Sequence, residues 1–134
     1  MINVGDNYSE TFTLTQEKVD LFAQITGDKN PLHLDAEYAA STVFKKPIIH
    51  GMFGAGIISK VLGMNFPGEG TIYLKQDISF KRPMYVDIEY QVVLTIKEVN
   101  TDKHTAVIET RILEKEKGKE IVSGQAEVMN KEKI

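Results

Sequence analysis

The chain of 134 residues contains no cysteine. This absence excludes a disulfide framework, a thiol nucleophile and any metal site that is built on thiolates. Long apolar runs are absent too. No stretch approaches the roughly 18 unbroken apolar residues of a membrane-spanning helix, and residues 1–30 hold no run typical of a signal peptide. We therefore expect a cytoplasmic protein without a membrane partner.

Arginine is scarce, since Arg82 and Arg111 are the only two, and the formal net charge is −3. Domains that bind nucleic acids usually carry a basic excess, so the composition argues against a nucleic-acid partner. The hydrophobic content of 42% and the charged content of 26% are ordinary for a soluble globular protein. The length predicts one domain over residues 1–134.

The first half of the chain predicts short elements with local caps. Residues 8–14 alternate between apolar and polar side chains, which predicts a strand. Thr15 is a good N-cap for a helix that ends at Gly27. Asp35 is a candidate cap for a short alanine-rich helix over residues 36–41.

The second half predicts a sheet. Apolar residues alternate with polar ones in four segments, and Pro83, Asn100 and Gly118 mark turns between them; the segments are residues 71–81, 88–96, 106–112 and 122–128. Such a pattern is typical of an antiparallel meander. Helices followed by strands predict an α+β fold in which the sheet covers an apolar helix.

One turn carries candidate catalytic groups. Asp28 and His33 lie on either side of Asn30-Pro31. Proline pushes the preceding residue out of the helical region, so the segment forms a turn that directs both side chains to one point. Asp28 offers a carboxylate, His33 titrates near neutral pH, and Asn30 is expected to hold the bend. On spacing alone, turn formation is an equally good explanation for these residues.

An apolar segment follows Gly51, and it predicts a buried helix. Glycines inside a helix cost about 1 kcal/mol each relative to alanine, so we expect close packing at Gly54 and Gly56, with Gly124 of the last strand as a neighbour. Gly63 is a candidate C-terminal cap. The N–H near Gly51 at the helix start is a candidate donor to an oxyanion.

These motifs together resemble the hydratase-2 signature of the MaoC-like dehydratases, the (R)-specific enoyl-CoA hydratases. The similarity spans essentially the whole chain, and its most specific parts are residues 27–33, 47–52, 70–74 and 79–83. It is closest to the short hydratases that supply (R)-3-hydroxyacyl-CoA for polyhydroxyalkanoate synthesis. The resemblance implies a hot-dog fold and a homodimer with sites at the interface, in some cases in a larger assembly. It implies an acyl-CoA substrate with neither cofactor nor metal.

The resemblance also implies residue roles. The Gly51 N–H would bind the thioester carbonyl, while Asp28 and His33 handle a water that adds to a trans-2-enoyl-CoA. We favour His33 as the base and Asp28 as the proton donor or water holder, and the reverse assignment stays open. Five further residues are expected near the substrate: Asn30, His50, Ser59, Leu62 and Val128. For His50, the expectation is a structural role or a place near the thioester, and not the role of the base. For Ser59, a hydrogen bond to its own helix is an equally good explanation.

Three alternatives to a hydratase are open. A hot-dog thioesterase would release free CoA, and a non-catalytic acyl-CoA-binding protein would bind without turnover. A metal site from Asp28, His33 and His50 is the least favoured, because the two histidines are 17 residues apart and lack the usual short ligand spacing. We expect a preference for short acyl chains of about four to six carbons, because each further methylene gains about 0.8 kcal/mol only where it finds apolar room.

Overall fold

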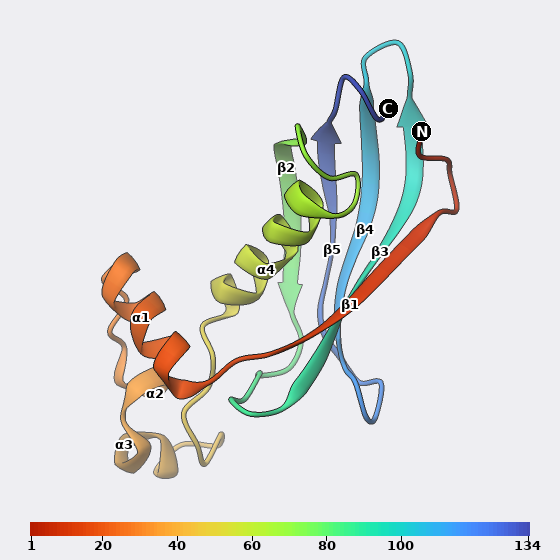
Figure 1. Cartoon of the computed structure of the whole chain (residues 1–134). Coiled ribbons are helices and arrows are strands. Elements are labelled where there is room, and N and C mark those ends of the chain that lie inside the picture. Colours follow the sequence, from red (N-terminus) through yellow and green to blue (C-terminus); the bar gives the residue numbers. More distant parts are fainter.

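The computed structural model describes residues 1–134 and begins with strand β1 (Asn7–Thr13) and helix α1 (Gln16–Thr26) (Figure 1). The Thr15 hydroxyl accepts a hydrogen bond from the Lys18 N–H at 3.3 Å. Gly27 ends the helix with a φ of +80°, which glycine adopts without steric cost. The predicted strand, helix and caps are therefore confirmed.

Two short helices follow, α2 (Pro31–Leu34) and α3 (Ala36–Ala40). The Asn30 side chain accepts from the Leu32 N–H at 3.1 Å, and the Asp35 carboxylate accepts from the Tyr38 N–H at 3.1 Å. The predicted turn after Asp28 thus becomes a single helical turn, because proline suits the first position of a helix.

Helix α4 (Gly51–Met64) lies against a five-stranded antiparallel sheet (Figure 1). The other strands are β2 (Ile72–Phe80), β3 (Glu89–Asn100), β4 (Thr105–Glu114) and β5 (Glu120–Met129), in the order β1-β3-β4-β5-β2. All four predicted strand segments are confirmed. A curved antiparallel sheet around one long helix is the hot-dog fold, so the α+β prediction is confirmed as well.

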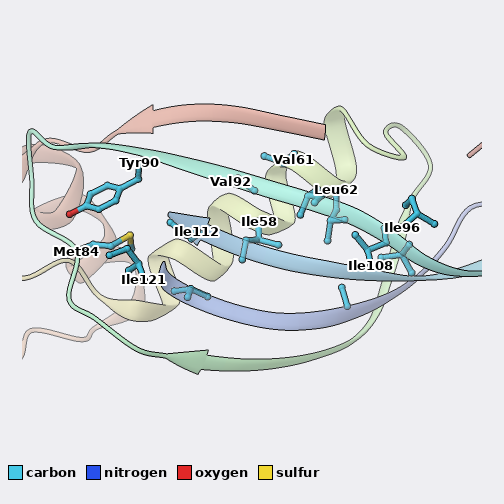
Figure 2. Close-up of a cluster of buried hydrophobic side chains, with 14 of the residues drawn as sticks. Ile58, Val61, Leu62, Met84, Tyr90, Val92, Ile96, Ile108, Ile112 and Ile121 are labelled. Atoms are coloured by element: carbon cyan, nitrogen blue, oxygen red, sulfur yellow. The ribbon is translucent and has the colours of Figure 1, made fainter. Parts of the chain in front are cut away.

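The core lies between one face of α4 and the concave face of the sheet (Figure 2). Ile58, Val61 and Leu62 of the helix are at most 1% exposed, and they point towards strand residues such as Ile96 and Ile108. The prediction of a buried helix holds for only one face of α4. Met52 and Met64 are exposed on the opposite side of α4.

Only one of the expected glycine contacts is present. At Gly54 an added Cβ would lie 3.0 Å from Met84 Cε and 3.1 Å from Ile112 Cδ1, whereas at Gly56 nothing lies within 4 Å. The predicted close packing is thus confirmed at Gly54 and wrong at Gly56. Gly63 is not a cap, because the helix continues to Met64.

Gly124 faces strand β2 rather than the helix. An added Cβ there would overlap the Asp77 carbonyl and approach the Gln76 amide. The expected contact between Gly124 and the helix glycines is therefore wrong, and the small residue is needed because two strands approach closely.

The end of the chain is packed against the rest of the protein. Ile134 is 1% exposed and belongs to the core, and the Ile2 N–H donates to the Lys133 carbonyl at 3.1 Å. His104 bonds the Ile134 oxygen through Nδ1 at 2.7 Å. None of the helices has the length and apolar character that a membrane span requires.

Candidate functional site

The candidate site forms where three segments meet: the end of α1, helix α2 and the start of α4. Asp28, His33 and His50 each bring a carboxylate oxygen or ring nitrogen to this point, and these atoms all lie within 4.8 Å of one another. Two reciprocal bonds hold the segments together. The Ile48 N–H donates to the Leu32 carbonyl at 3.2 Å, and the His33 ring bonds the Ile48 carbonyl. The two sequence motifs therefore converge in space.

The bond to Ile48 sets the proton position on His33. His33 Nδ1 lies 2.8 Å from the Ile48 carbonyl oxygen. A carbonyl only accepts, so Nδ1 carries the proton, and in the neutral ring Nε2 keeps its lone pair. The residue is 9% exposed. This arrangement provides a fixed imidazole with one basic nitrogen, as a general base requires.

Asp28 is exposed and belongs to the same turn. Its Oδ1 accepts from the Asn30 N–H at 3.4 Å, which leaves most of the carboxylate free for a water or a substrate. The Asn30 side-chain oxygen is used by the cap of α2. A role for Asn30 in substrate binding stays a prediction.

His50 contacts both of the other groups. It is 2% exposed, its Nε2 lies 3.0 Å from the Asp28 carbonyl oxygen, and its ring stacks on His33 with centroids 3.8 Å apart. The ring of Phe22 also packs against His50, with a centroid distance of 4.8 Å. His50 Nδ1 is buried without a hydrogen-bond partner.

The stacking of the histidines bears on the metal alternative. A metal ion lies in the plane of each imidazole that binds it, at about 2.0–2.1 Å from the nitrogen. The His33 and His50 planes are inclined by only 26° at a centroid distance of 3.8 Å. Two rings stacked in this way are poorly placed to share one ion with Asp28, so the geometry favours acid–base chemistry over metal binding.

Gly51 opens α4 immediately after His50. Neither the Gly51 N–H nor the Met52 N–H donates a hydrogen bond within the subunit. The partial positive charge of the helix N-terminus therefore faces outward at this point. An added Cβ on Gly51 would lie 2.7 Å from Phe80 Cε1, so a larger residue here would force the phenylalanine ring that covers it to move.

A mostly apolar pocket of about 410 Å³ adjoins Gly51. It lies between the start of α4 and the end of β2, and Phe44, Phe80, Lys81 and Arg82 are among its lining residues. The alternation over residues 71–81 did not predict that Phe80 lies against Gly51, since that contact joins segments far apart in sequence.

Three predicted substrate contacts lie elsewhere. Ser59 is exposed, Leu62 is 1% exposed and Val128 is fully buried. None of them lines the pocket beside Gly51. Their roles in substrate binding stay predictions, and in this subunit Leu62 and Val128 are parts of the core.

The comparisons with known proteins agree with this geometry. Residues 4–119 match the MaoC like domain. The chain is 42% identical to the (R)-specific enoyl-CoA hydratase of Aeromonas caviae over 111 residues, which cover 83% of this chain and 82% of that protein. It is 36% identical to the enzyme of the same name from Rhodospirillum rubrum over 128 residues, 96% and 88% of the two chains. A solved structure of the (R)-hydratase from A. caviae involved in PHA biosynthesis has a TM-score of 0.92 at 38% identity, and it covers 96% and 97% of the two chains.

Proposed function

The chain belongs to the MaoC-like dehydratase family, and we propose on this basis that it catalyses the reversible hydration of trans-2-enoyl-CoA to (R)-3-hydroxyacyl-CoA. The observation that carries the proposal is the convergence of Asp28, His33 and His50 next to the free N-terminus of α4. The names of the relatives, (R)-specific enoyl-CoA hydratases, support both the reaction and its stereochemistry. The product is of the kind that feeds polyhydroxyalkanoate synthesis, and the A. caviae hydratase with a similar structure is involved in PHA biosynthesis.

In the proposed mechanism the thioester carbonyl accepts a hydrogen bond from the Gly51 N–H. This bond and the helix dipole stabilise the negative charge that develops on the oxygen during attack. The enoyl group then becomes more electrophilic at C3. The pocket beside Gly51 supports this placement, because it is lined mostly by hydrophobic residues and offers an apolar surface to the acyl group.

The acid–base step is assigned to the turn. Asp28 is protonated at the start of this step. His33 Nε2 takes a proton from a water as the water oxygen bonds to C3, and Asp28 gives its own proton to C2. The proton on His33 then passes to the Asp28 carboxylate, which restores both groups for the next turnover. One water is consumed, and the net change is addition of OH and H across the double bond. The support for His33 as the base is its tautomer, since the bond from Nδ1 to Ile48 leaves Nε2 unprotonated.

We also propose a homodimer that forms through β2. This strand is at one edge of the sheet, and one of its sides has no partner strand. Ile72, Leu74 and Phe80 of β2 are between 48% and 54% exposed. An open edge with exposed apolar side chains favours association with a second copy. Because Phe80 and Gly51 line the pocket, such a dimer would bury the substrate site.

The proposed preference for short acyl chains is supported by the filled core. Leu62 and Val128 occupy the space between the second half of α4 and the sheet (Figure 2 shows Leu62). A long acyl chain would have to displace them. Chains of about four to six carbons need no such rearrangement.

The test is an assay with crotonyl-CoA. Hydration predicts loss of the enoyl absorbance without release of free CoA, and chiral analysis of the product should give the (R) isomer. Release of CoA without loss of the enoyl group would instead identify a thioesterase. Binding without either change would identify an acyl-CoA-binding protein.

A further inference from the structure

We propose that His50 is a positioning residue that holds Asp28 and His33 in the relative positions that catalysis requires. The inference rests on the proposed hydratase function, and it concerns a residue that reaches both members of the pair. His50 Nε2 bonds the Asp28 backbone carbonyl at 3.0 Å, and its ring stacks on His33 at 3.8 Å between centroids. One side chain therefore fixes the backbone of one group and the ring of the other.

The hydrogen bond assigns the tautomer of His50. The Asp28 carbonyl only accepts, so Nε2 carries the proton. The Nδ1 atom then has a lone pair, and it is buried without a donor. His50 is thus a donor to the turn and a flat surface for His33, and its second nitrogen is not used within the subunit.

The unpaired Nδ1 atom indicates that His50 is not present for stability alone. A buried polar atom without a partner is unfavourable for folding, and a phenyl ring would fill the same place without that cost. Phe22 already packs against the ring at 4.8 Å between centroids, so the surroundings suit an aromatic hydrocarbon. Packing alone does not explain a histidine here, whereas the N–H bond to Asp28 does.

Precise positioning has a large effect on rate. Misplacement of a reacting group by about 1 Å can reduce turnover about 100-fold. Asp28 is exposed and follows the end of α1, and its N–H donates to the Thr26 hydroxyl at 3.1 Å. That bond stays within the turn, whereas the bond from His50 to the Asp28 carbonyl links the turn to the start of α4, beside the Gly51 N–H.

Three variants separate the two contacts. Gln places its amide nitrogen near the position of Nε2, so His50→Gln keeps the donor and loses the ring. His50→Phe keeps the ring and loses the donor, and His50→Asn loses both. His104→Asn is the matched control, because His104 is also part-buried and hydrogen-bonded but lies by the C-terminus.

The measurements are kcat and KM with crotonyl-CoA, together with the thermal unfolding midpoint. We expect His50→Asn to lower kcat about 10- to 100-fold, with KM changed by no more than about twofold. His50→Gln should recover most of the lost kcat. His50→Phe should have a lower kcat than wild type with an unfolding midpoint that is unchanged or higher. The control should keep the wild-type kcat.

Other results would overturn the proposal. Wild-type kcat in His50→Phe would show that the N–H bond does not matter. Equal losses of kcat in His50→Gln and His50→Asn would also show that the N–H bond to Asp28 does not matter. If kcat fell only in proportion to the fraction of folded protein, His50 would have a structural role and no positioning role. If the wild-type protein failed to hydrate crotonyl-CoA, the proposed hydratase function itself would be wrong. If the wild type were active and the His50 variants had the same kcat, only the role of His50 would be wrong.

Discussion

A methyl group at Gly51 is the most direct probe of where the thioester lies. In Gly51→Ala the new Cβ would lie 2.7 Å from Phe80 Cε1 and 2.8 Å from Phe80 Cδ1. These distances are too short for carbon atoms, so the ring must move. Phe80 is 51% exposed, and its ring can therefore turn without disrupting the core.

The displaced ring and the methyl group narrow the space in front of the Gly51 N–H. Loss of a whole oxyanion donor costs about 10²–10³-fold in kcat. The N–H itself remains in the variant, so we expect a smaller loss of about 10- to 100-fold in kcat/KM, or about 1.4–2.7 kcal/mol. The free energy of unfolding should change by less than about 1 kcal/mol, because alanine suits a helix better than glycine and offsets the crowding.

The assay is hydration of crotonyl-CoA by Gly51→Ala, Phe80→Ala and the double variant. If the ring causes the loss, the double variant should be more active than the product of the two single effects predicts. Full activity in Gly51→Ala would refute the placement of the thioester against this residue. A strictly additive double variant would show that Phe80 does not mediate the effect.

The acid–base pair, the edge strand, the surface charges and the core can each be tested as well. Asp28→Asn and His33→Gln should each lower kcat about 10²–10⁴-fold with an unchanged circular dichroism spectrum; a variant that kept more than about a tenth of wild-type turnover would not carry this chemistry. Leu74→Lys should weaken the proposed dimer about tenfold or more, because it places a charge at the edge of β2, and sedimentation at several concentrations would detect the shift; an unchanged dimer would move the interface elsewhere. The pKa of Glu120 is lowered, first by the hydrogen bond from Lys81 and then by the hydrogen bond from Arg111. The contribution of Glu120 to stability is therefore complete above its ordinary pKa of 4.5 and is lost as the pH falls through the lower pKa of the folded state. Glu120→Gln should therefore lower the free energy of unfolding by about 0.5–1 kcal/mol at pH 7, and denaturant titrations should show this difference disappear in acid. Leu62→Ala should open the core, cost about 2–5 kcal/mol of stability and shift activity towards longer chains on four-, eight- and twelve-carbon enoyl-CoAs; a wild-type kcat/KM that rises steadily to twelve carbons would contradict the short pocket.

The sequence by itself determined most of the elements and several of their ends. Thr15 and Asp35 cap helices, Gly27 ends α1, and Asn30 starts the turn with Asp28, as their side chains predict. These features depend on φ, ψ and hydrogen bonds within about four residues, so local sequence is sufficient. Alternation was likewise sufficient for the four strands of the second half, because one face of each must be buried.

Contacts between distant segments were decided only by the tertiary structure. The stack of His50 on His33 and the ring of Phe80 over Gly51 join residues 17 and 29 positions apart. The single buried face of α4 was also not predictable, because apolar residues surround the helix and the sheet covers only one side. Such contacts follow from the packing of the whole core, in which many small interactions jointly set the position of each segment.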